Sequence, residues 1–297
     1  MLTILLALIA ALPLPHSADL YVSGFFDSSV QRFAGPRSSA PGAKTAAFYS
    51  RPVARRPWGL ALGPDGALWV ANQTGSPGIV RISGPFSATP GEVETIVDLG
   101  AFYDVAFGPD GNLYAAGAGP VQRYDVVTHK LIDEFTHGYD LAETRGIAFG
   151  PDGNLYVSNY IAGQKAEIVR FDGQTGEFID VYIARGHGGL SAPWKIAFNG
   201  RGELLVVDWE SGEGRILRYP ARLHRGSSAA TFITYPNFEP LYVAIGPDQN
   251  IYVSNSDSSG ASGSVLRFDG RTGAFIDVFA ANVAGGPRGL VFAPGGR

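Results

Sequence analysis

The chain has 297 residues, of which 40 are glycine and 17% are charged, and its formal net charge is −4. It contains no cysteine, which excludes disulfides and thiolate metal sites, and its acidic balance offers no general attraction to a nucleic-acid backbone. Frequent glycine together with 12% aromatic residues favours a β-protein with many tight turns.

The first 18 residues have the pattern of a signal peptide. An apolar run from Leu2 to Leu12 is followed by prolines and then by the small residues Ser17 and Ala18. Such a run is too short to span a bilayer. No Lys or Arg precedes it and His16 stands near the expected cleavage site, so a buried strand or a mistaken start site are the alternatives. We expect residues 1–18 to direct secretion to the periplasm or outside the cell. We see no other candidate membrane span.

A sequence motif close to GPDGNLYVSN recurs along the rest of the chain. The position of its first glycine is occupied, at intervals of 45, 42, 49, 47 and 47 residues, by Gly63, Gly108, Gly150, Asn199, Gly246 and Ala293. The clearest unit holds four apolar runs of strand length, at 145–150, 154–159, 167–172 and 177–183, with turn residues between them. Four antiparallel strands repeated at this period predict the blades of a β-propeller.

Two further patterns predict six blades and a closed ring. An arginine in the third strand recurs six times, which predicts a structural contact between blades, at Arg32, Arg81, Arg123, Arg170, Arg218 and Arg267. The segment after residue 18 begins like a second strand, and residues 287–297 read as a first strand with nothing after it. We expect the C-terminal strand to complete the N-terminal blade, so that 19–297 is one all-β, six-bladed domain. Such closure removes exposed sheet edges.

The pattern GIAFGPDGNLYVSN…IVRFD…GEFIDVY resembles that of NHL-repeat propellers. More loosely, it is similar to the superfamily that includes gluconolactonase-like lactonases and streptogramin lyases. The resemblance covers essentially all of residues 19–297 and implies the fold. It leaves the activity open, because propellers carry many unrelated functions.

The six units differ most at the start of their first strands, which lie at the mouth of the central channel in this architecture. The first position of these strands holds Trp58, Tyr103, Arg145, Trp194, Leu241 and Arg288. The second is glycine in three units and otherwise Asp104, Lys195 and Tyr242. Since units three apart face each other, Trp58 should face Trp194, and Arg145 should face Arg288.

This set of side chains has two interpretations. Aromatic faces and guanidinium groups suit a small ligand with a sugar-like or apolar face and an acidic group. The expected ligand contacts are Trp58, Tyr103, Asp104, Arg145, Trp194, Lys195, Tyr242 and Arg288. The alternative is that the same side chains plug the channel and only fill space.

Weaker candidates for chemistry lie in the loops. His137 and His187, together with Asp104, are candidates for acid–base catalysis. Asp208 and Glu210 could bind a divalent cation such as calcium or magnesium, but they lack the spacing of a calcium loop. The Asx residues at the second-strand ends, of which Asp208 is one, are expected to cap loop backbone.

The resemblance to lactonases implies one divalent metal at the channel mouth, held by Glu, Asn and Asp side chains. The first positions supply none of these, and two arginines there would repel the ion. We therefore expect a secreted, monomeric binding propeller for a small anionic or carbohydrate-like ligand, with no nucleic-acid partner. A metal-dependent lactonase or lyase and a protein-interaction scaffold are the alternatives.

Overall fold

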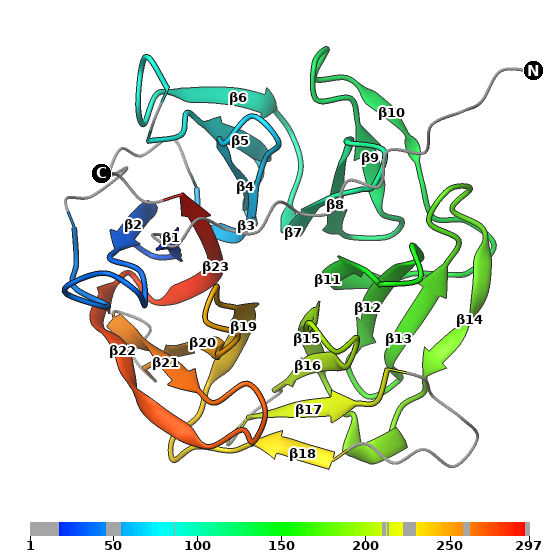
Figure 1. Cartoon of the computed structure of the whole chain (residues 1–297). Helices are drawn as coiled ribbons and strands as arrows, with labels where there is room; N and C mark the ends of the chain where they lie inside the picture. The colour runs from blue at the N-terminus through cyan, green and yellow to red at the C-terminus, as the bar shows by residue number, and fades with distance from the viewer. Residues whose placement is uncertain are drawn as a thin grey trace, which may run out of the picture.

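The computed structural model describes residues 18–45, 55–85, 87–209, 212, 214–221, 230–257 and 262–294. The signal-peptide prediction, over 1–18, and the candidate ligand Glu210 lie outside these residues, apart from Ala18. Six β-sheets stand around a central axis like the blades of a fan (Figure 1). The prediction of a six-bladed propeller is confirmed.

Each blade is an antiparallel sheet whose first strand is innermost, and we number the blades by these inner strands. Blade 1 contains β3 (Pro57–Leu62), β4 (Leu68–Asn72), β5 (Ile79–Ile82) and β6 (Val93–Val97). Blade 2 contains β7 (Phe102–Phe107), β8 (Leu113–Gly117), β9 (Gln122–Tyr124) and β10 (Leu131–Glu134). Blade 3 contains β11 (Glu143–Phe149), β12 (Leu155–Ile161), β13 (Lys165–Phe171) and β14 (Phe178–Ile183).

The second half of the ring follows the same order. Blade 4 contains β15 (Pro193–Phe198), β16 (Leu204–Asp208), β17 (Arg215–Tyr219) and β18 (Ala230–Ile233), preceded by the short 3-10 helix η1 (His187–Gly189). Blade 5 contains β19 (Pro240–Ile245), β20 (Ile251–Ser256), β21 (Ser262–Phe268) and β22 (Phe275–Ala284). Blade 6 contains β23 (Pro287–Pro294), β1 (Ala18–Gly24) and β2 (Ser29–Phe33).

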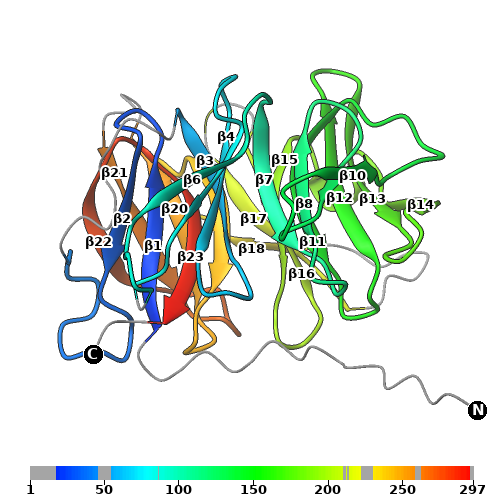
Figure 2. The ribbon, with the colours of Figure 1, turned by 90° about the horizontal axis from the view of Figure 1, so that it is seen from above.

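The two ends of the described chain meet in blade 6, as predicted. Strand β23 pairs antiparallel with β1, with Leu20 opposite Phe292 and Val22 opposite Leu290. Figure 2 shows β1 and β23 side by side. Within the described part of the chain, the fourth position of this blade is marked by an isolated bridge between Phe33 and Lys44. The sheet is therefore closed by one strand from the C-terminal end and strands from the N-terminal end.

The recurring GPDGNLY phrase forms a hydrogen-bonded turn. In blade 3, Asp152 Oδ2 accepts hydrogen bonds from Asn154 Nδ2 at 2.8 Å and from the Tyr156 hydroxyl at 2.9 Å. Gly153 adopts a φ of 80°, which favours glycine. A Cβ on Gly150 would approach the Tyr156 ring to 2.5 Å, so the first glycine makes room for the tyrosine. The repeat is thus conserved within the chain for folding reasons.

The third-strand arginines correct one prediction. Instead of joining neighbouring blades, most of them join strands of one blade. Arg170 donates to Asp180 on β14 at 3.1 and 2.7 Å, and its Nη1 lies 3.7 Å from Asp152 in the turn. Arg218 makes both kinds of contact, since its Nε lies 3.8 Å from Glu203 in its own blade and its Nη1 donates to the carbonyl of Arg271 in the next blade at 3.1 Å. A repeat reveals that an arginine needs a partner in every blade, but not whether that partner is in the same blade.

Candidate functional site

The mouth of the channel is closed by an aromatic cluster. Trp58 and Trp194 stack across the axis with ring centroids 5.3 Å apart and planes inclined by 14°. Tyr103 meets the edge of this pair, 5.4 Å from Trp58. Phe25 and Leu241 pack beside them, and Trp58 is only 6% exposed. We call Phe25, Trp58, Tyr103, Trp194 and Leu241 the aromatic cap. The expected opposition of Trp58 and Trp194 is confirmed.

Each predicted arginine packs on one member of the tryptophan pair. The Arg145 guanidinium lies 4.0 Å from the ring centre of Trp194 and 3.7 Å from that of Tyr160. The Arg288 guanidinium lies 5.3 Å from the ring centre of Trp58. Cation–π contacts of this kind contribute more when they are desolvated. The two arginines therefore pack against the aromatic cap.

The hydrogen bonding of the arginines is incomplete. Arg288 is 9% exposed, donates from Nη1 to the Ser256 hydroxyl and the Pro287 carbonyl, and forms no ion pair with the described residues. Burial lowers the pKa of Arg288 to about 10. Arg145 donates to Glu143 at 3.2 Å. In both arginines the buried Nε has no hydrogen-bond acceptor among the described residues.

The second-position residues form a closed polar network under the cap. Asp104 is fully buried, and its Oδ2 accepts from Lys195 Nζ at 2.5 Å and from the backbone N–H of Ile147 at 3.0 Å. Its Oδ1 accepts from the Tyr242 hydroxyl at 2.9 Å. Burial and the neighbouring Asp104 charge raise the pKa of Tyr242 well above its usual value. The structure thus brings these three predicted residues together, and they satisfy one another.

This network does not fit a divalent metal of the kind that the lactonase resemblance implies. Both oxygens of Asp104 are engaged, and the Lys195 ammonium holds the place beside them that a cation would take. Asp208 accepts from the N–H groups of Ser191 and Ala192 and pairs with Arg215 at 2.8 Å. It therefore caps a loop. Among the described residues, no three His, Asp or Glu side chains gather into a possible metal site.

Comparison with known proteins agrees with this architecture. The chain matches no protein-family model and no curated protein. Among solved structures, it is similar to a chain of a nidogen/laminin complex, with 19% identity and a TM-score of 0.67 over 93% of this chain and 98% of that one. Its fold is shared with extracellular and enzymatic propellers.

Two gluconolactonases are also similar to this chain in fold. The enzyme from Xanthomonas campestris has 14% identity and a TM-score of 0.63 over 80% of this chain and 83% of its own. The periplasmic enzyme from Pseudomonas aeruginosa has 14% identity and a TM-score of 0.59 over 93% of this chain and 99% of its own. At these identities the likeness establishes the propeller fold alone.

The two candidate histidines lie on the outside of the propeller. His137 is exposed, and its backbone bonds to Gly176 and Phe178 in the outer hairpin of blade 3. His187 is exposed in helix η1, with its ring centre 6.4 Å from that of Tyr219. Neither is hydrogen-bonded to the buried Asp104, whose bonding partners come from inner strands. The three candidates for acid–base chemistry therefore do not form one hydrogen-bonded site.

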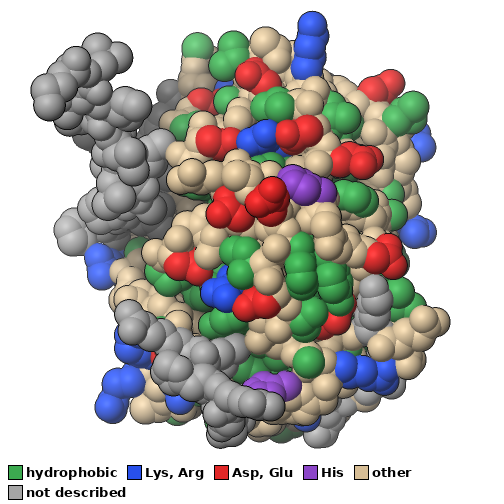
Figure 3. Space-filling model, turned by 90° about the vertical axis from the view of Figure 1, so that its right-hand side faces the viewer, with side chains coloured by type: hydrophobic (Ala, Val, Ile, Leu, Met, Phe, Trp, Pro, Cys, Tyr) green, Lys and Arg blue, Asp and Glu red, His purple; other side chains and the backbone are tan. Residues whose placement is uncertain are grey.

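Figure 3 shows acidic and basic side chains mixed with hydrophobic ones over the side of the molecule that lies to the right in Figure 1. Exposed hydrophobic residues of the outer strands include Leu131 and Ile132 on β10 and Ile179 on β14. No helix in the described ranges is long and apolar enough to cross a membrane.

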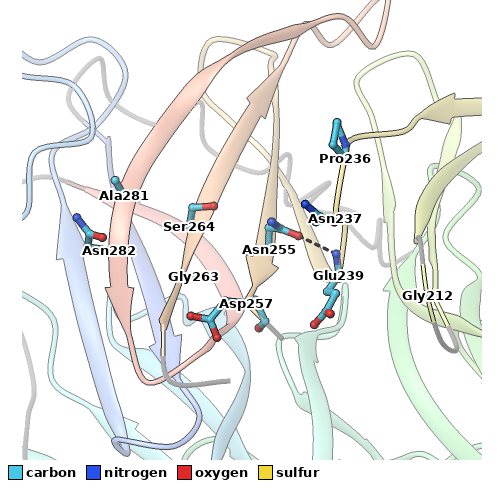
Figure 4. Close-up of a pocket in the computed structure, with 11 residues that line it drawn as sticks. Gly212, Pro236, Asn237, Glu239, Asn255, Asp257, Gly263, Ser264, Ala281 and Asn282 are labelled. Atoms are coloured by element: carbon cyan, nitrogen blue, oxygen red, sulfur yellow. Dashed lines mark hydrogen bonds between the residues drawn. The ribbon is translucent and has the colours of Figure 1, made fainter. Parts of the chain in front are cut away.

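Sequence reasoning missed one cleft. A hollow of about 770 Å³ lies between blades 4 and 5, where the connection from β18 to β19 approaches the ends of β20, β21 and β22 (Figure 4). Its polar lining includes Asn237, Glu239, Asn255, Asp257, Ser264 and Asn282. The signal for it in the sequence is a short side chain, Ser264, at a repeat position that holds Glu167 and Arg215 in blades 3 and 4.

Proposed function

We propose that the chain is a non-catalytic binding propeller whose aromatic cap receives a small ligand with an acidic group and a sugar-like or apolar face. The observation that carries this proposal is the Arg145–Trp194 contact. It joins a partly exposed aromatic face to a guanidinium whose buried Nε has no acceptor among the described residues. A ligand that displaces part of the cap would bring an anionic oxygen to that donor and would pack its ring against the indole.

The polar network under the cap favours binding over catalysis. Asp104 is the only carboxylate in the first two positions of the six inner strands, and it is committed to Lys195 and Tyr242. It offers neither a free general base nor a metal ligand. The neighbouring cap residues are aromatic, aliphatic or cationic, which suits recognition of negative charge.

The proposal is tested by titrating the protein with glucuronate, gluconate, sulfate and phosphate while tryptophan fluorescence is recorded, with neutral glucose as the reference ligand. Arg145→Gln should weaken binding of the preferred anion about tenfold or more. Arg81→Gln is the matched control, because Arg81 pairs with Asp65 at the outer part of blade 1. Equal binding by both variants, or no response to any anion, would refute the site.

A metal-dependent lactonase is the second candidate, because two gluconolactonases share the fold. Purified protein should be assayed on gluconolactone with calcium, magnesium or zinc added. We expect no rate above the uncatalysed one, because Asp104 would have to release Lys195 to bind a metal. A metal-dependent rate that Asp104→Asn abolishes would establish the enzyme instead.

We also propose that the protein is exported, on the strength of the apolar segment in residues 1–18. Expression of the full chain followed by mass analysis of the mature protein tests this. A mature chain beginning at Asp19 and recovered outside the cytoplasm is expected. An intact N-terminus on a cytoplasmic protein would contradict it.

A further inference from the structure

The cleft between blades 4 and 5 adjoins the Arg288 side of the aromatic cap, because the Ser256 hydroxyl that lines it accepts a hydrogen bond from Arg288. Figure 4 shows Asn255 on β20 between Ser264, on the neighbouring strand β21, and the pair Asn237 and Glu239 on its other side. Asn282, near the end of β22, lies at the outer side. The hollow of about 770 Å³ falls within the range of natural small-molecule sites.

Comparison of the blades explains why this place is hollow. In blade 3, Asn159 faces Glu167 across the strands, and the Glu167 carboxylate accepts from Asn159 Nδ2 at 2.8 Å and from the Tyr139 hydroxyl at 2.9 Å. The repeat position of Glu167 is therefore filled by a long side chain that satisfies the asparagine.

Blade 4 fills the same place in another way. Asp208 faces Arg215, and the guanidinium donates to Asp208 Oδ2 at 3.0 and 2.8 Å. In blade 5, Asn255 faces Ser264, which is too short to reach it as Glu167 or Arg215 would. The cleft thus occupies a position that protein side chains fill in the two preceding blades.

The vacant position leaves a specific hydrogen-bonding group unused. Asn255 Oδ1 accepts from the backbone N–H of Glu239 at 2.8 Å. Its Nδ2, the group that in Asn159 donates to Glu167, has no acceptor among the described residues. Asn237 and Asn282 have φ values of 52° and 53°, a conformation that asparagine tolerates, so backbone geometry already explains them. Capping of the Glu239 N–H explains the Oδ1 atom of Asn255, but neither its Nδ2 nor Ser264 has a structural role of this kind.

We propose that this cleft binds a neutral polyhydroxylated ligand, such as one sugar residue of a saccharide. Hydroxyl groups both donate and accept, which matches the amides of Asn255, Asn237 and Asn282 and the carboxylates of Glu239 and Asp257. The two carboxylates disfavour an anion. Their pull on a cation is reduced, because the Arg288 charge acts on Glu239 and the Ser262 hydroxyl donates to Asp257 at 2.5 Å.

The test uses variants that copy the other blades. Ser264→Glu reproduces the Asn159–Glu167 pair and should fill the cleft without loss of stability. Asn255→Asp introduces a carboxylate like that of Asp208. This carboxylate still accepts the Glu239 N–H but cannot donate to a ligand. Ser264→Ala keeps the space and is the control. The probes are glucose, galactose, mannose, N-acetylglucosamine, cellobiose and lactose, and calcium chloride is titrated separately.

Binding is measured by calorimetry and by shifts of the asparagine side-chain amide signals in isotope-labelled protein. We expect at least one neutral sugar to bind, about tenfold or more weaker binding in Ser264→Glu and Asn255→Asp, and unchanged binding in Ser264→Ala and Arg81→Gln. The proposal is overturned if no sugar in the panel binds, if Ser264→Glu binds normally, or if only calcium titrates. Loss of sugar binding in Arg145→Gln would assign it to the cap instead.

Discussion

Trp58 and Trp194 begin inner strands three blades apart and stack face to face on the propeller axis, with ring centres separated by 5.3 Å. Residues from the two halves of the chain therefore meet in one contact. The contact closes the channel mouth and also supports Arg145 and Arg288. The cap is thus a structural plug, and under the proposed function it is also the surface that receives the ligand.

The first prediction concerns the stability of this cap. Trp58→Ala removes a side chain that is 6% exposed and leaves a cavity beside Trp194, Tyr103 and Phe25. We expect the free energy of unfolding to fall by about 3–5 kcal/mol, measured by urea denaturation. Trp58→Phe is the control and should cost less, because it retains an aromatic ring. A cost below about 1 kcal/mol for Trp58→Ala would show that the cap collapses freely around the gap.

The second prediction concerns the buried ion pair. Lys195→Met leaves the fully buried Asp104 without its cationic partner. We expect the free energy of unfolding to fall by about 3–5 kcal/mol, because an unpaired charge is then buried.

A double substitution separates the charge effect from packing. Lys195→Met combined with Asp104→Asn removes both charges, so it should recover part of the stability lost in the single variant. Thermal unfolding of the two single variants and the double variant forms a complete cycle. Strict additivity of their effects would contradict the assigned pairing.

The fold could be predicted from the sequence because each repeat contains the residues that form the same hydrogen-bonded turn. The Asp152–Asn154–Tyr156 hydrogen bonds recur with Asp110–Asn112–Tyr114 and Asp248–Asn250–Tyr252. Each set fixes the hairpin between the first two strands of its blade. Because each repeat forms one such hairpin, the number of repeats predicts the number of blades, and the incomplete repeats at the two ends predict the closure.

The interior of the site was predictable only in part. Opposition of Trp58 and Trp194 followed from the symmetry of the ring. The repeat also placed Asp104, Lys195 and Tyr242 at the channel mouth, but it did not show that they bond to one another. Those bonds depend on how far the Lys195 and Tyr242 side chains reach between blades, which strand periodicity does not give.

The cleft escaped prediction for a different reason. The cleft is present because the Ser264 side chain is short. A short polar side chain in a strand does not by itself indicate a site. The short side chain becomes informative only when it is paired with Asn255, because Asn159 and Asp208 face long side chains at the equivalent position. Strand register was needed to make the comparison.

The third prediction concerns alkaline pH. Burial raises the pKa of Tyr21 and of Tyr139 to about 12, and it raises those of Tyr114, Tyr156 and Tyr252 further. A phenol with a raised pKa in the folded state binds its proton more tightly there than in the unfolded chain. Its contribution to stability is complete below pH 10 and is lost as the pH rises through about 12.

Arg288 acts in the opposite direction over part of this range. Its lowered pKa of about 10 means that the unfolded state binds more protons above that pH, which favours folding slightly as pH rises. The buried tyrosines outnumber it, so we expect net destabilisation above pH 10. Phenolate absorbance should show only some of the 13 tyrosines ionising near pH 10 in the folded protein, and all of them in urea. Full ionisation near pH 10 without unfolding would contradict this.

The fourth prediction concerns closure of the ring. A chain ending at Gly286 lacks β23, so it loses the partner of β1 and the contacts of β23 with the inner strands β3 and β19. The exposed edge of β1 is then free to pair with other chains. We expect this truncated protein to aggregate and to lose its cooperative thermal transition, as followed by light scattering and circular dichroism.

A chain ending at Pro294 is the matched control for this truncation, because it retains every residue that pairs with β1, from Pro287 to Pro294. It should unfold at the temperature of the full chain. Adding a synthetic peptide of residues 287–294 to the shorter chain should restore part of the transition, since the missing strand can be supplied in trans as in other strand-addition complexes. If the chain ending at Gly286 remains monomeric and unfolds cooperatively at an unchanged temperature, β23 is dispensable, and pairing with β1 does not hold the propeller closed.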